Sequence, residues 1–302
     1  MSFEKYFGKE IKSKQKITII LGSGFHKYKC DDKNYFNDWK LLLMQICKKP
    51  ILENENFLLT FESQLVNSNI NRPATQTQNG VLDIVAKKLN EHQEKVNLNN
   101  YPSFIFNPSY VSDVIVLNFD EVAEKVCQYH FGAKISKEKY IKINNKSLTA
   151  QIHQTTRYKE VTFKNGGIIK FWHPHGLVSK PKNMILGLRQ YTNHISSVEE
   201  LRKHSKSTNR NTKEPTWYNK LTHQTVLILG ARISDIEIDL WTAFVNRERN
   251  FAKEENKKHR KPIYQMREKD TVSNSNKKWF EPMFDESLSF PEQWEELEKL
   301  FK

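Results

Sequence analysis

Cysteine is scarce in this 302-residue chain, which carries only Cys30, Cys47 and Cys127. No two of them stand at the spacing of a metal-binding pair, and three cysteines do not suggest a disulfide framework. The sequence therefore predicts neither a zinc ribbon nor a disulfide-stapled fold, and it fits a reducing cytoplasm. Long apolar runs are also lacking, since no stretch approaches the roughly 20 residues of a membrane span. We expect a soluble, cytoplasmic protein.

Acidic residues are in the minority, with 35 Asp and Glu against 48 Lys and Arg, and the formal net charge is +13. Such a charge permits nucleic-acid binding. The basic residues are scattered, however, and even the densest run, Lys253 to Lys261, contains Glu254 and Glu255. A nucleic-acid groove would show clustered Lys and Arg with aromatic side chains for stacking. The pattern favours a solvated surface over a nucleic-acid interface.

What the chain does have is a set of short runs rich in Val, Ile and Leu, which is typical of parallel strands buried on both faces. Two segments joined across an Asn-Gly-Gly turn predict a hairpin at 158–163 and 168–172. The sequence predicts an α/β fold with an open, Rossmann-like, mainly parallel sheet. The clear strand candidates are residues 17–21, 114–117, 168–172 and 226–229, with shorter ones at 182–186 and 261–266.

Helical periodicity of apolar residues separates several of these runs. Residues 204–214 are too hydrophilic for a core and are expected to form a surface loop. Residues 51–110 lack strand signals but hold helical segments at 53–66 and 81–94, so we interpret them as a helical insertion in a single domain spanning residues 1–302. Further helices are expected at residues 36–47, 121–129, 198–204, 236–249 and 291–301.

Small residues follow the first apolar run, as Gly22-Ser23-Gly24. Ligands of open α/β sheets collect at the carboxyl ends of parallel strands, and glycine there lets backbone N–H groups approach a phosphate. A plain tight turn explains the same pattern equally well, and the full Rossmann glycine fingerprint fails because Lys27 occupies its last position. The glycine turn alone therefore leaves both interpretations open.

Polar residues end two further runs. Asn118 and Asp120 stand where burial is costly without hydrogen bonds, and Asn118 could contact a ligand or simply cap the following helix. His175 could take a proton from a sugar hydroxyl or a water near pH 7, or it could be a structural histidine. In an extended segment His173 and His175 would point the same way, but two histidines without further ligands nearby give poor support for zinc.

In their order and spacing, these segments resemble the motifs of the sirtuin-like superfamily, and more closely those of its bacterial antiphage branch than those of the protein deacylases. The resemblance spans roughly residues 17–241, which is most of the chain. G-A-G-x-S is similar to Gly22-Ser23-Gly24-Phe25-His26, W-x-x-L-L to Trp39-Lys40-Leu41-Leu42-Leu43, T-x-N-F-D or T-x-N-Y-D to Val116-Leu117-Asn118-Phe119-Asp120, H-G with a later proline and tyrosine to His175-Gly176, Pro181 and Tyr191, and G-x-S-x-x-D to Gly230-Ala231-Arg232-Ile233-Ser234-Asp235.

The resemblance implies two catalytic residues: Asn118 would order the nicotinamide ribose of NAD and the attacking water, and His175 would be the base. Two positions depart from the family pattern, because His26 and Arg232 both stand where the family usually has Ser. Arg232 could still pair with the pyrophosphate, since a guanidinium offers two parallel donors. The residues that would bind NAD are Gly22, Ser23 and Gly24 at the pyrophosphate, Asp120 at the carboxamide, and His26, Gly230, Arg232 and Ser234.

The resemblance also implies an activity, the hydrolysis of NAD to ADP-ribose and nicotinamide by a toxic effector of bacterial antiphage defence. The sirtuin-like subunit of KongMing-type systems is such an effector. No sensor domain is evident, so we expect activation by a protein partner or a small-molecule signal, and a homo- or hetero-oligomer. No metal is expected.

Two alternatives remain at this point. Sirtuin deacylases usually carry two C-x-x-C pairs in a zinc module, and the absence of any C-x-x-C here argues against a deacylase. A basic nucleic-acid-binding module with a degenerate nucleotide fold is the non-enzymatic alternative, and a steep fall of affinity with salt would support it.

Overall fold

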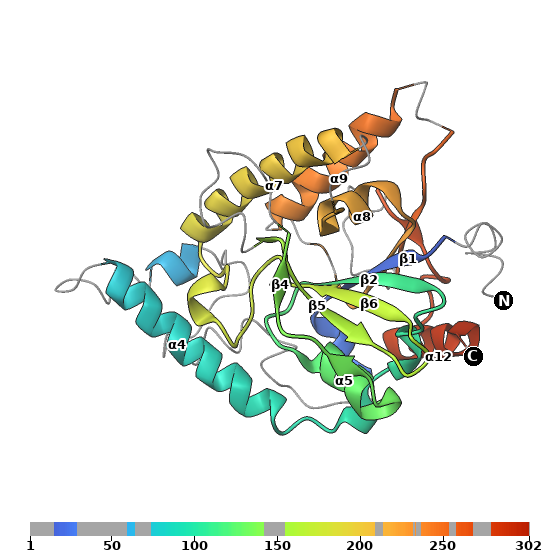
Figure 1. The fold of residues 1–302 in the computed structure, drawn as a ribbon, viewed down its shortest axis with the longest axis horizontal. Helices are drawn as coiled ribbons and strands as arrows, with labels where there is room; N and C mark the ends of the chain where they lie inside the picture. Colours follow the sequence, from blue (N-terminus) through green and yellow to red (C-terminus); the bar gives the residue numbers. More distant parts are fainter. Residues whose placement is uncertain are drawn as a thin grey trace.

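The computed structural model describes residues 15–28, 59–63, 74–141, 155–208, 214–231, 233, 237–253, 258–267 and 279–301. These residues form one open sheet with helices on both faces (Figure 1). The predicted α/β fold with a mainly parallel, Rossmann-like sheet is therefore confirmed. The predicted helix at residues 36–47 lies outside the described residues.

The sheet has the strand order β3-β5-β6-β2-β1-β7-β8-β9, with β4 paired to β5. The six neighbouring strands β6, β2, β1, β7, β8 and β9 run parallel to one another. Strand β5 pairs antiparallel with β6 and forms the predicted hairpin with it. The chain order reverses at β1, which has β2 on one side and β7 on the other, and open α/β sheets bind their ligands at such a switch point. The strands are β1 Ile17–Leu21, β2 Val111–Val116, β3 Lys134–Ile135, β4 Lys139–Tyr140, β5 Arg157–Thr162, β6 Ile168–Trp172, β7 Val226–Leu229, β8 Ile263–Gln265 and β9 Glu281–Pro282.

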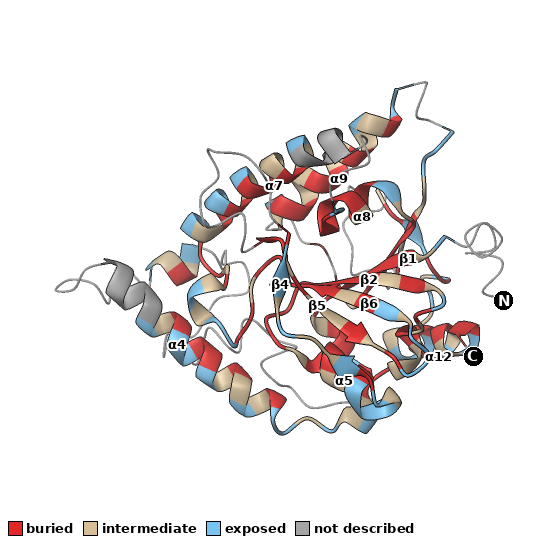
Figure 2. Ribbon diagram, in the orientation of Figure 1, coloured by how far each residue is buried: buried red, intermediate tan, exposed pale blue. Residues whose placement is uncertain are grey.

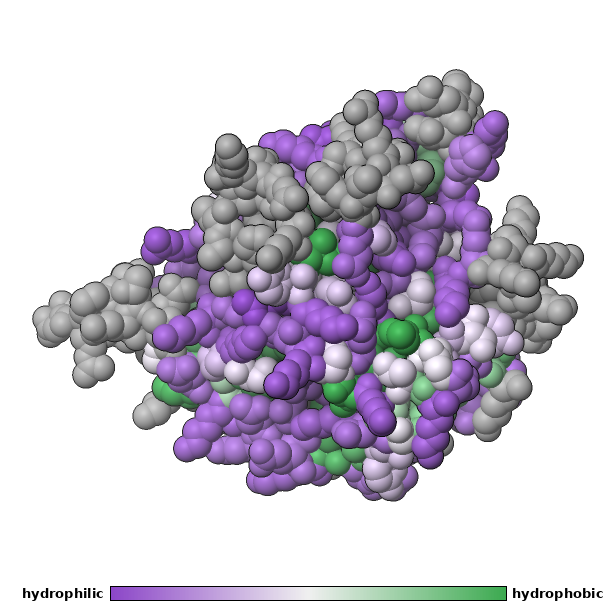
Figure 3. Space-filling model, viewed as in Figure 1, coloured by the Kyte–Doolittle hydropathy of each residue, from purple (hydrophilic) through white to green (hydrophobic). Residues whose placement is uncertain are grey.

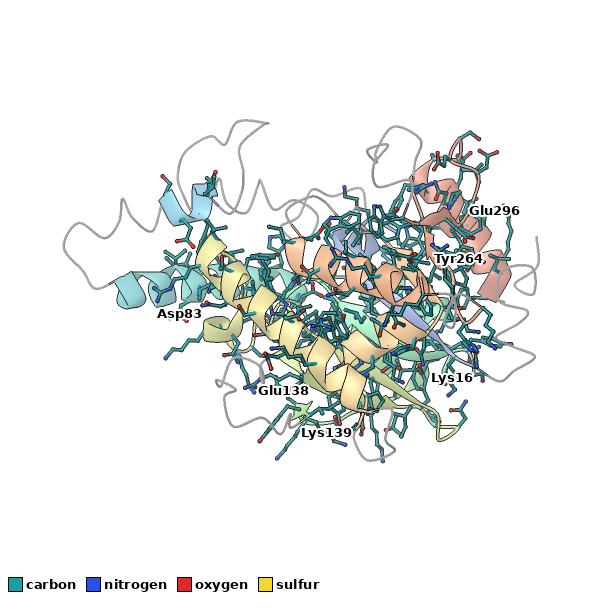
Figure 4. The ribbon with its side chains drawn as sticks, turned by 90° about the horizontal axis from the view of Figure 1, so that it is seen from above. Lys16, Asp83, Glu138, Lys139, Tyr264 and Glu296 are labelled. Atoms are coloured by element: carbon teal, nitrogen blue, oxygen red, sulfur yellow. The ribbon has the colours of Figure 1, made fainter. Side chains whose placement is uncertain are left out.

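Two sets of helices cover the sheet, one on each face (Figure 1). The first set packs on what we call the α9 face and the second on the α5 face. Seen from above, α7 and α9 lie side by side, and the charged residues Asp83, Glu138 and Lys139 lie at the periphery (Figure 4). The first set is α7 (Leu188–Thr208), α8 (Trp217–His223) and α9 (Ile238–Phe251); the second is α4 (Ala74–Gln93), α5 (Val122–Phe131) and α12 (Phe290–Phe301).

The central strands are buried on both faces, which explains their continuous apolar sequences. Every residue of β1 and of β7 is buried. Because successive side chains of a strand point to opposite faces, Ile19 belongs to the core of the α5 face and Ile20 to that of the α9 face. The helices direct their buried sides towards these two cores (Figure 2). The sheet is thus a rigid platform from which loops emerge at the carboxyl ends of the strands.

Local sequence fixes where several elements begin and end. Helix α8 begins at a capping box, in which the Asn219 side chain accepts the backbone N–H of Thr216 at 3.0 Å. Helix α5 ends at Gly132, whose φ of +59° is the left-handed conformation that favours glycine. The predicted helices at 121–129, 236–249 and 291–301 are confirmed as α5, α9 and α12.

Two expectations between β6 and α8 are wrong. Residues 182–186 form no strand: Pro181–Asn183 is a short 3-10 helix, η4, and Ile185 donates its backbone N–H to the carbonyl oxygen of His175 at 2.8 Å. The segment therefore folds back on the loop after β6 and does not extend the sheet. Residues 204–208, expected in a loop, continue α7, because a hydrophilic sequence is also compatible with a helix end.

Within residues 51–110, where a helical insertion is expected, residues 59–63 are helical and α4 covers Ala74–Gln93. None of the described helices is long and apolar enough to cross a membrane. The face of the molecule drawn in Figure 3 is mostly hydrophilic, with apolar residues in small separate patches.

Candidate active site

Four loops that carry predicted site residues meet at one edge of the sheet. They follow β1, β2, β6 and β7, which are neighbouring parallel strands, so their carboxyl ends lie side by side. Arg232 and Ser234 lie outside the described residues, and the other predicted site residues are all in these loops. The loop residues concerned are 22–26, 117–120, 173–176 and 230–231.

Gly22, Gly24 and Gly230 pack two of the loops tightly against each other. A Cβ atom added to Gly22 would lie 2.6 Å from Ala231 Cβ, and one added to Gly24 would lie 2.6 Å from Gly230 Cα. The N–H groups of Gly22 and Gly24 donate to the carbonyl oxygens of Leu229 and Gly230, at 3.0 and 2.8 Å. Glycine is needed here for loop packing, and these two N–H groups are already used within the protein. A role at a pyrophosphate stays a prediction.

His26 contacts both polar residues that follow β2. It lies in the short 3-10 helix η1 (Ser23–Lys27), and its ring is buried. Its Nε2 lies 3.1 Å from Asp120 Oδ2 and 3.1 Å from the side-chain amide of Asn118, while its Nδ1 lies 3.0 Å from the Tyr101 hydroxyl. One ring nitrogen thus touches two side chains. The histidine that departs from the family pattern joins the loops after β1 and β2.

Asp120, and not Asn118, accepts the N–H of Val122, the first residue of helix α5, with an Oδ1 distance of 3.0 Å. Of the two roles open to Asn118, the helix cap is therefore wrong, since its side chain contacts His26 instead. Burial acts to raise the pKa of Asp120, but the charge and hydrogen bond of His26 and the Val122 N–H outweigh it, so this pKa lies below its ordinary value. Asp120 is a carboxylate at neutral pH, with both oxygens engaged.

His175 is held between the end of β2 and helix α9. Its Nδ1 lies 3.3 Å from the carbonyl oxygen of Leu117, and its Nε2 lies 2.8 Å from Oδ2 of Asp239. The ring is buried. Because Leu117 directly precedes Asn118, the structure brings the two residues that sequence analysis assigns to catalysis to the same end of β2.

Asp239 has a second histidine neighbour, His194 of α7. The Nε2 atom of His194 lies 3.1 Å from Oδ2 of Asp239, and the rings of His175 and His194 meet edge to face with centroids 5.7 Å apart. Asp239 is completely buried, at 0% exposure. In the part of the chain that the structure describes, Oδ1 of Asp239 and Nδ1 of His194 have no hydrogen-bond partner.

One carboxylate and two imidazoles share this cluster, so their ionisations are coupled. Burial acts to lower the pKa of His175, but the charge and hydrogen bond of Asp239 raise it above the ordinary 6.5. For His194 burial prevails, and its pKa is lowered. Burial opposes ionisation of Asp239, yet the two histidines hold its pKa well below the ordinary 3.8. The cluster therefore holds an ionised Asp239, whose charge favours the protonated form of His175, beside a neutral His194.

The same three side chains have one ligand atom each within 4.8 Å of one another, which is near enough to surround a metal ion. In a tetrahedral zinc site with bonds of about 2.0–2.1 Å, ligand atoms lie roughly 3.3 Å apart. Here His175 Nε2 and Asp239 Oδ2 are 2.8 Å apart, which is the distance of a charge-assisted hydrogen bond. The spacing fits a shared proton better than a shared metal.

Asp239 and His194 were not predicted as site residues from the sequence, although each leaves a signal in it. Asp239 precedes Ala243 by four residues on the buried face of α9, and His194 precedes Val198 by four on the buried face of α7. A titratable side chain at a core position of a helix needs a buried partner. The periodicity reveals that such a partner exists but not which residue it is.

His173 pairs with the opposite face of the sheet. Its Nε2 lies 2.7 Å from Oε1 of Glu124 on α5, and both side chains are 1% exposed. The expectation that His173 and His175 point the same way is wrong, because Pro174 and His175 lie in a turn and not in an extended segment. Gly176 has a φ of +94°, and its N–H donates to the His173 carbonyl oxygen at 3.1 Å.

An open α/β sheet with titratable side chains gathered at its switch-point edge is the architecture of a nucleotide-binding enzyme. Residues 113–284, more than half of the chain, match the SIR2-like domain, and the protein belongs to this family. Members of the SIR2-like domain family are NAD-dependent enzymes. The match includes Asn118, His175 and Asp239 but begins after the glycine loop that follows β1. No curated protein matches the chain.

Proposed function

We propose that this protein hydrolyses NAD to ADP-ribose and nicotinamide. One observation carries the proposal: Nδ1 of His175 lies 3.3 Å from the carbonyl oxygen of Leu117, the residue directly before Asn118. A residue with a side-chain amide that can order water and an imidazole that can accept a proton therefore lie at the same strand end. The family of NAD-dependent enzymes to which the chain belongs supports NAD as the substrate.

The reaction needs an ordered water and a base. Nicotinamide leaves with the electron pair of its bond to C1 of the ribose, the oxygen of a water bonds to C1, and that water loses a proton to the protein. Asn118 would hold the water in line, and the neutral form of His175 would take up the proton. The carboxylate of Asp239 stabilises the resulting imidazolium through a charge-assisted hydrogen bond.

The other predicted contacts extend along the same sheet edge. Asp120 would read the nicotinamide carboxamide, which requires an oxygen that now faces His26. Ser23 is half-buried between two glycines whose N–H groups are engaged, so the pyrophosphate contact falls mainly to Ser23. Gly230, directly after β7, would border the adenosine half, and the predicted NAD contacts of Arg232 and Ser234 concern residues outside the described part of the chain.

Nicotinamide release from NAD by the purified protein tests the proposal. We expect His175→Ala and Asn118→Ala each to lower turnover by roughly 10²–10⁴-fold, which is the usual contribution of a general base or a comparable group. His130→Ala is the matched control, because His130 is an exposed histidine of α5 that contacts the Leu98 carbonyl oxygen. Near-native turnover by site variants that fold, as judged by circular dichroism, would contradict the catalytic assignment.

A deacylase would behave differently, because it consumes NAD together with an acylated peptide. No C-x-x-C pair is present in the sequence to form the zinc module of such enzymes. We expect nicotinamide release without any peptide, no deacetylation of lysine peptides, and no stoichiometric zinc by elemental analysis. One zinc per chain, or robust deacetylation, would favour the deacylase.

We further propose that the activity serves a toxic effector of bacterial antiphage defence, such as the sirtuin-like subunit of a KongMing-type system. Uncontrolled NAD hydrolysis would kill the host, so a protein partner, a small-molecule signal or oligomer formation would release the activity. The helical insertion offers a contact surface, since Leu59 and Ile84 are 55% and 50% exposed. Light scattering and turnover measured across concentrations test this, and a fully active monomer at nanomolar concentration would contradict it.

A further inference from the structure

Both ring nitrogens of His175 face groups that only accept hydrogen bonds. Nε2 faces the Asp239 carboxylate at 2.8 Å, and Nδ1 faces the Leu117 carbonyl oxygen at 3.3 Å. A neutral imidazole has a single N–H and can satisfy one of these acceptors, whereas an imidazolium satisfies both. The protonated ring is therefore the form that matches the geometry of this site.

The two contacts differ in strength. The bond to Asp239 is short and charge-assisted, while the contact to Leu117 is long and involves a neutral acceptor. When the ring loses one proton it keeps the stronger bond, so the remaining N–H stays on Nε2. A lone pair then appears on Nδ1 and faces an oxygen that repels it. The Nδ1 side is the one that can exchange the carbonyl for a hydroxyl or a water.

We propose that Asp239 is a positioning residue that fixes the His175 ring and keeps its Nε2–H, which makes Nδ1 the atom that exchanges protons with the substrate. The role of Nδ1 rests on the proposed NAD hydrolysis. The protonation state of the His175 ring in the free protein does not depend on that proposed activity. A base held by a third group in this way is a general arrangement in enzymes that activate a nucleophile.

Other titratable groups face His175 from two helices. Glu237 precedes α9, and Tyr191 and His194 lie on α7. Burial raises the pKa of Tyr191 well above its ordinary value, with Asp239 and Glu237 adding to the effect, so the phenol is neutral. His194 is neutral as well, because burial lowers its pKa. Among the described residues, Asp239 is the carboxylate in contact with the ring, so a change there should have the largest effect.

Nuclear magnetic resonance of the full chain with ¹⁵N-labelled histidine tests the ring state directly, with His175→Gln used to assign the signals. For the wild type we expect His175 to titrate above pH 6.5 and its neutral form to carry the proton on Nε2. Asp239→Asn keeps the shape and an acceptor oxygen but removes the charge, so the titration midpoint should fall. The kcat of NAD hydrolysis should fall by roughly 10²-fold or more, with KM little changed and the pH profile displaced downwards.

Glu124→Gln is the matched control, because it makes the same chemical change in the other buried histidine–carboxylate pair of this loop. It should leave the His175 midpoint and the pH profile of NAD hydrolysis unchanged. A parallel shift in both variants would mean that Asp239 acts only through general packing, and this would overturn the proposal.

Three further results would also overturn it: a neutral His175 with its proton on Nδ1, an unchanged midpoint in Asp239→Asn, or binding of one equivalent of Co²⁺ that Asp239→Asn abolishes. If Asp239→Asn does not fold, the position of the proton on the neutral His175 ring of the wild type, Nε2 or Nδ1, still tests the proposal. If the protein hydrolyses no NAD but its histidine signals behave as expected, the proposed function fails while the positioning of His175 by Asp239 stands.

Discussion

His173 and His175 are two residues apart and make the same kind of bond, yet they pair with helices on opposite faces of the sheet. His173 pairs with Glu124 of α5 at 2.7 Å, and His175 pairs with Asp239 of α9 at 2.8 Å. All four side chains are buried. By distance, burial and the chemistry of the partner, the two pairs are equivalent.

The second ring nitrogen distinguishes them. Among the described residues, Nδ1 of His173 has no hydrogen-bond partner, and neither has Oε2 of Glu124. Nδ1 of His175 faces the carbonyl of Leu117, next to Asn118. A buried histidine–carboxylate pair is therefore not a catalytic signal by itself. What the other nitrogen faces decides whether the pair is a candidate for catalysis.

The largest expected effect separates the two histidines by activity. His175→Gln should lower NAD turnover by roughly 10²–10⁴-fold, because it removes the general base. His173→Gln should leave turnover near the wild-type value once the fraction of folded protein is taken into account. The measurement is nicotinamide release at saturating NAD. Equal losses in both variants would break the comparison and make His173 part of the site.

Loss of the carboxylate should lower the free energy of unfolding by a similar amount in the two histidine–carboxylate pairs. Glu124→Ala and Asp239→Ala each leave a buried histidine without its carboxylate, and breaking a buried pair costs about 3–5 kcal/mol. Urea unfolding followed by circular dichroism measures both losses. A cost under about 1 kcal/mol for either variant, as for a pair exposed to solvent, would show that this pair is not buried in solution.

The turn that sends the two histidines apart can be tested through Gly176. A Cβ added there would lie 2.2 Å from the Asn183 carbonyl oxygen, and the φ of +94° already disfavours other residues. Gly166 in the β5–β6 turn is the matched control, with a φ of +80° and nothing within 4 Å of an added Cβ. Gly166→Ala should cost only the left-handed strain of about 1–2 kcal/mol, and Gly176→Ala clearly more. Similar costs in urea unfolding would contradict this account of the turn.

The smallest expected effect concerns pH. The pKa of His175 is raised above 6.5 in the folded protein, so its contribution to stability is fully present below pH 6.5 and is lost as the pH rises through the raised value. The excess free energy of unfolding of the wild type over His175→Gln should therefore shrink by about 1.4 kcal/mol per pH unit between these two values. Urea unfolding from pH 5.5 to 8.5, from about one unit below to about two units above the ordinary histidine pKa, measures this difference. An excess that grows with pH would contradict it.

Much of the fold could be predicted from the sequence, because burial on both faces leaves a direct trace in it. The runs that became β1, β2, β6 and β7 are rich in Val, Ile and Leu, and the polar residues after them predicted one shared edge. The strand expected at 182–186 is wrong because its apolar residues serve a loop that bonds back to His175. Short apolar runs look alike whether they pair in a sheet or pack in a loop.

The site was only half predictable for a similar reason. Asn118 and His175 stand two and three residues after the ends of β2 and β6, where position alone marks them. Asp239 and His194 lie inside helices, and Asp239 is 64 residues from His175 along the chain. The spacing of the glycines after β1 left a phosphate turn and a plain tight turn equally open, and it did not predict that two of their N–H groups donate to the end of β7 and the residue after it. Hydrogen bonds between segments that are far apart in the sequence produce no residue spacing from which they could be predicted.

The contact between those two loops has a mechanical consequence. Gly24 donates its N–H to the carbonyl oxygen of Gly230, and the Cα atoms are too close for any side chain to fit between them. Neither loop can move away from the sheet without breaking the backbone hydrogen bonds that join the two loops. The two loops therefore behave as one rigid unit attached to β1 and β7. A ligand that binds at this edge of the sheet contacts two loops that are held rigidly together. Any movement that closes over the ligand must therefore come from another segment of the chain.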